Sequence, residues 1–240
     1  MESIYKTIVV KLSGEALADE GDKTIYDRKL LKDIAHTIHD IVNLGTRVGV
    51  VVGAGNIWRG RLAEKVGIER STGDYMGMLG TIINALALQS AFEEEGMCTR
   101  VMSAIDVPQV CEPYIRRKAM SHLEKGRVVI FAGGTGNPYF TTDSTATLRA
   151  LDIGADAILM GKNGVEGVYD KDPRSNKDAK LLRHLTFQEV VEKKLGVMDL
   201  TAVAMLETSP IKIHVYNMDD QTAPIRILKG EAIGSVISKE

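Results

Sequence analysis

The stretch FAGGTGNPYFTTDST, residues 131–145, decides how the rest of the chain is interpreted. A run expected to be a strand, residues 127–132, leads into a loop of small residues, and a helix-like pattern begins behind it. Glycine lets the backbone turn where a side chain would clash, and it lets a ligand approach closely. The hydroxyl groups and Asp143 are suitable helix N-caps, and a helix N-terminus favours anions. The stretch therefore predicts either an ordinary strand–turn–helix corner or an anion-binding loop.

Composition excludes several classes of protein. The chain has 240 residues, of which 44% are apolar, so it can bury one large core as one domain or as two closely packed lobes. A formal net charge of −2 gives no electrostatic case for nucleic acid as the main ligand. The two cysteines, Cys98 and Cys111, are too few and too far apart for a zinc site or a redox pair. Since no signal peptide and no uninterrupted membrane-spanning run are present, we expect a soluble, cytoplasmic protein without membrane partners.

Strand-like and helix-like segments alternate along the chain. The expected strands are residues 7–12, 46–52, 99–103, 127–132, 157–160, 212–216 and 225–228. The expected helices are residues 28–44, a segment opened by Gly73-Asp74 and running to about residue 95, and residues 114–125, 144–151, 187–194 and 199–207, with a polar loop over residues 15–26. Such alternation predicts the α/β class, as a three-layer αβα sandwich with a mostly parallel sheet.

Two further glycine loops follow expected strands. Lys11 lies at the end of the first strand, directly before Ser13-Gly14, and the second strand leads into Gly53-Ala54-Gly55-Asn56-Ile57-Trp58-Arg59-Gly60. The carboxyl ends of parallel strands are where α/β sheets bind ligands, and an arginine there can bind phosphate oxygens. Lys11 could also be a lysine that extends to the surface. Asp74 could be a helix N-cap or could accept hydrogen bonds from sugar hydroxyls.

Together the three loops offer cations, hydroxyls and backbone N–H groups. No Ser/His/Asp or Cys/His arrangement, no close carboxylate pair and no G-x-x-x-x-G-K-[ST] is present. Phosphoryl transfer needs charge stabilisation and in-line positioning of the two reactants. If the acceptor is itself a phosphate, it is already an anion near pH 7 and needs no general base.

At this level of detail the sequence resembles the bacterial UMP kinase family, which has the amino acid kinase (carbamate kinase-like) fold. The motifs that carry the resemblance are KLSGEAL (11–17), VVVGAGNIWRG (50–60), GDYMGMLG (73–80), GTGNPYFTTDSTA (134–146) and VMDLTAV (197–203). The resemblance implies transfer of the ATP γ-phosphoryl group to UMP in pyrimidine nucleotide biosynthesis. It also implies Mg²⁺ held mainly by the ATP phosphates, and one domain over residues 1–240. An acceptor lobe would cover about residues 1–155 and an ATP lobe about residues 156–240.

The resemblance also implies roles for individual residues. The ATP site would comprise Lys11, Leu12, Ser13, Gly14, Gly55, Arg59, Asn163, Tyr169 and Asp172. The UMP site would comprise Ala54, Asp74, Thr135, Gly136, Asn137, Pro138, Tyr139, Phe140, Thr141 and Thr142. The catalytic group would be Lys11, Arg59, Asp143 and Asp199, with Asp143 organising the cations and Asp199 supporting the nucleotide end.

The family is hexameric, activated by GTP and inhibited by UTP in many bacteria. Arg100 and Arg127 match positions of the GTP site, whereas Gln89 and Ser90 replace a charged pair of some relatives. The segment Lys162-Asn163-Gly164-Val165 is one residue longer than the usual pattern, which affects the position of Asn163. Two other interpretations stay open: a kinase of the same fold that acts on a carbamate, acetylglutamate or aspartate, and a nucleotide sensor without turnover.

Overall fold

The computed structural model describes residues 2–18 and 24–240. The strands are β1 (Thr7–Leu12), β2 (Arg47–Val52), β3 (Thr99–Ser103), β4 (Glu112–Pro113), β5 (Val128–Ala132), β6 (Ala157–Lys162), β7 (Val168–Tyr169), β8 (Leu181–Leu182), β9 (His184–Thr186), β10 (Lys212–Asn217) and β11 (Ser235–Ser238). The helices are α1 (Arg28–Asn43), α2 (Arg70–Glu94), α3 (Arg116–Glu124), α4 (Thr142–Ile153), α5 (Phe187–Glu192), α6 (Leu200–Leu206) and α7 (Ala223–Leu228), with short 3₁₀ helices η1 (Gly14–Leu17), η2 (Gly60–Leu62) and η3 (Glu64–Val66).

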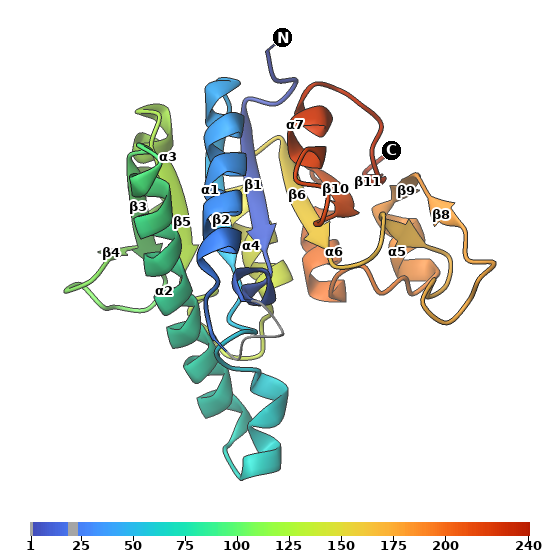
Figure 1. Ribbon diagram of the computed structural model, residues 1–240. Coiled ribbons are helices and arrows are strands. Elements are labelled where there is room, and N and C mark those ends of the chain that lie inside the picture. Colours follow the sequence, from blue (N-terminus) through green and yellow to red (C-terminus); the bar gives the residue numbers. More distant parts are fainter. Residues whose placement is uncertain (1, 19–23) are drawn as a thin grey trace.

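Within these described ranges, nine strands form one sheet in the order β4-β3-β5-β2-β1-β6-β10-β11-β9. The strands from β4 to β10 run parallel, and β11 pairs antiparallel with β10. Helices α1, α2 and α7 cover one face, and α3, α4, α5 and α6 cover the other (Figure 1). The predicted three-layer sandwich with a mostly parallel sheet is therefore confirmed.

The central strands are buried on both faces, which explains why they read as continuous apolar runs. Residues Ile8, Val9, Val50, Val129 and Ile158 are all at most 1% exposed. Each βα unit then leaves its loop at the carboxyl edge of the sheet. Side-chain caps fix the helices that follow: Asp27 caps α1, Thr141 caps α4 and Asp199 caps α6.

Three details differ from the sequence-based expectation. Residues 225–228 form part of helix α7 and not a strand, because the short run Ile225-Arg226-Ile227-Leu228 fits either element and Pro224 favours a first helical turn. Helix α2 begins at Arg70, so Asp74 lies inside it and is not its N-cap. Strand β11, which the sequence analysis did not predict, lies in the sheet between β10 and β9.

Two segments need separate mention. In the polar loop expected over residues 15–26, residues 19–23 lie outside the described part, and the residues before them form η1. Helix α2 is long and apolar enough, by length and composition alone, to cross a membrane. Core helices of soluble proteins pass the same test, and the sheet-facing residues Ile82, Ala85, Leu88 and Phe92 of α2 are buried.

Candidate active site

The glycine loops that follow β1 and β2 are in direct contact. A Cβ atom on Gly14 would lie 2.5 Å from Asn56 Oδ1 and 2.6 Å from the backbone nitrogen of Gly55. A Cβ atom on Gly53 would lie 3.2 Å from Thr142 Oγ1, at the start of α4. The loops after β1 and β2 and the segment that follows the loop after β5 therefore converge at the carboxyl edge of the sheet, as the topology predicts.

Lys11 and Asp143 form an ion pair at this edge. Lys11 Nζ lies 3.0 Å from Asp143 Oδ1, and the two side chains are only 15% and 17% exposed. Lys11 comes from the end of β1, and Asp143 comes from the first turn of α4. A partly buried ammonium held by a carboxylate has a fixed position, so it can act on a phosphoryl group without first reorganising.

Lys162 is a second cation at the same place, and the sequence analysis did not select it. It is the last residue of β6, which pairs with β1 so that Lys11 is opposite Met160. Its Nζ donates a hydrogen bond to the Val197 carbonyl oxygen at 2.5 Å. Burial and the nearby Lys11 lower the pKa of Lys162, and the negative charge of Asp143 partly offsets this. Its position at the end of a buried strand, like that of Lys11, was the signal that could have found it.

A cavity of about 270 Å³ lies between α2 and the loop after β5. Several residues expected in the UMP site line it: Ala54, Asp74, Thr135, Asn137, Phe140, Thr141 and Thr142. Gly136, Pro138 and Tyr139 belong to the same loop but lie outside this lining. The backbone nitrogen of Tyr139 donates to Asp74 Oδ2 at 2.8 Å, and Arg70 Nε lies 3.0 Å from Asp74 Oδ1. Asp74 thus connects α2 to the tip of the loop.

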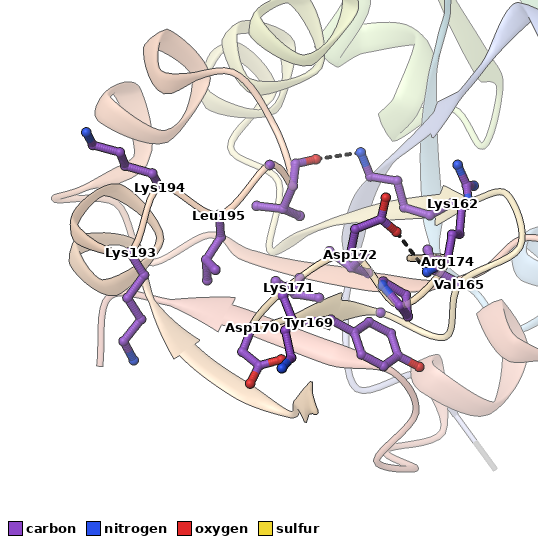
Figure 2. A pocket seen from close by; sticks show the side chains of 16 residues that line it. Lys162, Val165, Tyr169, Asp170, Lys171, Asp172, Arg174, Lys193, Lys194 and Leu195 are labelled. Atoms are coloured by element: carbon purple, nitrogen blue, oxygen red, sulfur yellow. Dashed lines mark hydrogen bonds between the residues drawn. The ribbon is translucent and has the colours of Figure 1, made fainter. Parts of the chain in front are cut away.

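A second cavity, of about 450 Å³, lies on the other side of Lys162. Figure 2 shows Tyr169, Asp172 and Lys162 around it, with Lys193 and Lys194 on the far side. Asn163 is not in its lining. It borders a neighbouring cavity of about 600 Å³ together with Lys11, Ser13 and Lys162. Lys162 therefore stands where these two cavities meet.

Other expected ATP-site residues lie around the first two loops. Leu12 and Ser13 line a further cavity of about 250 Å³ next to α1, together with Lys11. Arg59 turns toward the first loop, where its Nη2 lies 2.6 Å from Glu15 Oε1. Its Nε also donates to the Gly55 carbonyl oxygen at 3.4 Å. Arg59 thus bridges the mouths of the loops after β1 and β2.

Asp199 is fully engaged in local hydrogen bonds. Its Oδ1 accepts from the Ala202 backbone nitrogen at 2.8 Å and caps α6. It also accepts from the hydroxyl of Thr141 and, at 3.1 Å, from the hydroxyl of Ser144. These bonds fasten the start of α4, which carries Asp143, to α6. The carboxylate of Asp199 therefore positions Asp143.

Arg100 and Arg127 lie apart from this edge. Arg100 Nε is 3.9 Å from Glu112 Oε1, and Arg127 Nη1 is 3.0 Å from His122 Nδ1. Lys118 Nζ, 3.4 Å from Glu112 Oε2, completes a group of basic side chains around one carboxylate. Burial raises the pKa of Glu112, but hydrogen bonds from His122 and Lys118 outweigh this effect and lower the pKa overall.

The chain is similar to known proteins over almost its whole length. The model of the amino acid kinase family matches residues 6–217. A uridylate kinase of Limosilactobacillus reuteri is 50% identical over 234 residues, which is 97% of each chain. The crystal structure of a UMP kinase from Bacillus anthracis superposes with a TM-score of 0.95 at 43% identity, covering 98% of this chain and 97% of that one. A UMP kinase from Ureaplasma parvum superposes with a TM-score of 0.93 at 39% identity, covering all of both chains.

Proposed function

The chain belongs to the amino acid kinase family, and from that premise we propose that it is a uridylate kinase, transferring the γ-phosphoryl group of ATP to UMP. The observation that carries the proposal is the cavity walled by Thr135, Asn137 and Thr142, at the same edge of the sheet as the Lys11–Asp143 ion pair and as a further cavity lined by Lys11 and Lys162. One cavity beside the loop after β5 and another lined by two cations suit two nucleotides whose phosphates face one another.

In the proposed reaction, UMP occupies the cavity beside α2 and the loop after β5. Thr135 to Thr142 surround its base and phosphate, Asp74 accepts from its ribose, and Ala54 meets it through the backbone. A phosphate oxygen of UMP attacks the γ-phosphorus of ATP, and the bond to the β-phosphate oxygen breaks, which yields UDP and ADP. Since the attacking oxygen is already anionic near pH 7, no residue removes a proton.

ATP occupies the opposite side. Its phosphates lie on Lys11 to Gly14, Gly55 and Arg59, and its base and ribose lie toward Asn163, Tyr169 and Asp172. Lys11 stabilises the charge of the transferring group, and Lys162 adds a second cation from β6. Asp143 holds Lys11 in place, and Asp199 holds the start of α4.

The residues present fit a magnesium ion that enters with ATP. Across residues 2–18 and 24–240, His, Cys, Asp and Glu form no group of three that could enclose a metal. Mg²⁺ commonly binds through one or two carboxylates and the substrate's own phosphates, and Asp143 is the carboxylate paired with Lys11. When bound, Mg²⁺ neutralises charge on the phosphates of ATP.

An exposed stripe on α2 supports an oligomer, which we propose to be a hexamer built from dimers. The side chains of Tyr75, Leu79 and Ile83 form an exposed apolar stripe along α2, at spacings of four residues. Such a stripe on a 25-residue helix is suited to burial against a second copy.

The basic group around Glu112, with Arg100 and Arg127, supports a separate anionic effector site, for GTP as activator or UTP as inhibitor.

The remaining proposals concern organisation and place. The chain forms one domain, in which the acceptor lobe (about 1–155) and the ATP lobe (about 156–240) share one sheet and meet where β1 pairs with β6. The enzyme acts in the cytoplasm, in pyrimidine nucleotide biosynthesis.

The test is coupled ADP release with ATP and a panel of acceptors. Turnover with UMP, and much less with CMP or AMP, is the expected result. Turnover with acetylglutamate or carbamate and none with UMP would instead assign a kinase of the same fold with another acceptor. UMP binding without turnover would indicate a nucleotide sensor.

A further inference from the structure

Helix α2 carries two polar side chains on the face that it buries against the molecule. Thr81 is 8% exposed and Asn84 is 0% exposed, in a segment otherwise made of apolar and small residues. A buried polar group is costly unless it is hydrogen-bonded. Both side chains are hydrogen-bonded, and the partners belong to two different glycine loops of the candidate active site.

Thr81 holds the loop after β5. Its Oγ1 donates to the Met78 carbonyl oxygen at 2.7 Å, inside α2. The same oxygen accepts a hydrogen bond from the backbone nitrogen of Gly133 at 2.8 Å. Gly133 opens the loop and has a φ of 73°, so the chain turns out of the strand direction at this residue. The hydroxyl of Thr81 therefore fixes the point where the acceptor loop leaves the sheet.

Asn84 holds the loop after β2. Its Nδ2 donates to the Gly53 carbonyl oxygen at 2.7 Å and to Asn56 Oδ1 at 2.8 Å. Its Oδ1 accepts from the Tyr26 hydroxyl at 2.9 Å and from Asn56 Nδ2 at 3.1 Å. Every donor and both lone-pair positions of the Asn84 amide are thus in use. From helix α2, the Asn84 side chain therefore holds both ends of the Gly53–Asn56 loop.

Thr81 and Asn84, the two anchoring residues, are at positions i and i+3 of helix α2. Residues i and i+3 lie on the same face of an α-helix at a fixed spacing. Between the helix and the second loop there is no free space, because a Cβ atom on Gly80 would lie 2.9 Å from Ala54 Cβ. Helix α2 therefore sets the separation of the two loops as a rigid spacer.

We infer that Thr81 and Asn84 are positioning residues that hold the acceptor loop and the Gly53–Asn56 loop at the separation needed for in-line transfer. The inference rests on the proposed function, in which the loop after β5 binds UMP and the loop after β2 contacts both nucleotides. Asn84 is not part of the lining of the acceptor cavity. Thr81 is part of that lining, but its hydroxyl is engaged by the Met78 carbonyl oxygen and the Gly133 backbone nitrogen, so each residue acts through the backbone of the loop that it holds.

Thr81→Val is the main test, because valine keeps the shape of threonine and removes only the hydroxyl. The KM for UMP should rise about tenfold, since a buried N–H loses its partner, while the KM for ATP stays unchanged. Thr81→Ser, which restores the hydroxyl, should return the KM for UMP toward the wild-type value. Thr147→Val is the matched control: Thr147 is 0% exposed, and its hydroxyl has no hydrogen-bond partner among the residues described.

Asn84→Leu extends the test to the other loop. It should raise the KM for both nucleotides and lower kcat, because the Gly53–Asn56 loop borders both sites. If this variant does not fold, the Thr81→Val, Thr81→Ser and Thr147→Val enzymes are sufficient to test the inference. A Thr81→Val enzyme with the same KM values as Thr147→Val would overturn the inference, even if its melting temperature were lower.

Amide hydrogen exchange separates this inference from the proposed function. Thr81→Val should speed exchange in the peptide that contains Gly133, and Thr147→Val should not, whatever the enzyme phosphorylates. Wild-type protein that does not turn over UMP would refute the proposed function, and unchanged exchange at Gly133 would refute the anchoring role of Thr81.

Discussion

At the scale of single residues, the ion pair of Lys11 and Asp143 is the feature with the largest expected effect on rate. Replacing Lys11 by alanine should lower kcat by at least about 10²-fold, as is typical when a main electrostatic stabiliser is removed. Lys6→Ala is the matched control, because Lys6 is exposed and lies just before the other end of β1. Steady-state kinetics of both variants provide the measurement. Equal kcat values for Lys11→Ala and wild type would remove Lys11 from the mechanism.

His214 gives the protein a pH-dependent stability. It is buried in β10, and its Nε2 lies 2.8 Å from the Tyr5 hydroxyl. Burial, together with the charge of Lys212, lowers its pKa from 6.5 to about 4. Between these values the unfolded chain binds a proton that the folded protein does not, so stability present above pH 6.5 is lost as the pH falls toward 4. The loss should reach about 3 kcal/mol.

Urea unfolding of wild type and His214→Gln at several pH values between 7.5 and 4.5 tests this. The variant should lose less stability over that interval than wild type, since glutamine does not titrate. Carboxylates contribute equally to both proteins, so their effect cancels in the difference. Parallel curves for the two proteins would show that His214 is not the responsible group.

At the scale of elements, the turn into β11 depends on one glycine. Gly234 has a φ of 65°, and a Cβ atom there would lie 2.1 Å from the Val215 carbonyl oxygen and 2.8 Å from that of Glu166. Gly230 also has a positive φ, of 90°, but its Cβ would meet only Ile4 Cγ2 at 3.8 Å. Gly230→Ala should therefore cost about 1 kcal/mol, and Gly234→Ala clearly more, since β11 must shift. Thermal unfolding of both variants provides the comparison, and equal costs would contradict the proposed steric origin.

Much of the fold could be predicted from the sequence, because its signals are local. The buried runs of β1, β2 and β5, each ending in a glycine loop, are visible without any tertiary information. Helix α7 was mistaken for a strand because a run as short as Ile225-Arg226-Ile227-Leu228 has no period that distinguishes the two elements. Strand β11 was missed because a four-residue strand with serine at both ends becomes recognisable only through its pairing with β10.

The candidate site likewise contains residues that local sequence signals identify and residues that only the tertiary structure identifies. Residues inside motifs, such as Lys11 and Asp143, could be selected from the sequence. Lys162 ends a buried strand, as a reading of the sequence could have noted, but its place beside Lys11 follows only from the pairing of β6 with β1. Thr81 and Asn84 read as polar interruptions of an apolar helix, and only the position of the loops around α2 gives them a role.

At the scale of the whole molecule, the apolar stripe on α2 predicts association. Tyr75, Leu79 and Ile83 are 44%, 49% and 48% exposed. Introducing charge with Leu79→Glu and Ile83→Glu together should yield a smaller species in solution, because burying unpaired carboxylates is costly. Val191→Glu is the control, since Val191 is 44% exposed on α5, away from the stripe.

Sedimentation velocity at micromolar protein concentration measures the result. Wild type and Val191→Glu should sediment as the same oligomer, and the double variant as a lower one. A monomeric mass for wild type would contradict the proposed association through α2.

The place of β11 in the sheet has a consequence for the order of assembly during synthesis. β9 (His184–Thr186) pairs with β11 (Ser235–Ser238), which in turn pairs with β10. A ribosome makes β9 about fifty residues before the strand that must receive it. The parallel strands from β4 to β1 can assemble while the chain is still growing, but β9 waits until β11 has been made. A nascent chain thus exposes an unpaired β9 until about fifty further residues have been made, and this is the interval in which a chaperone would have most to protect.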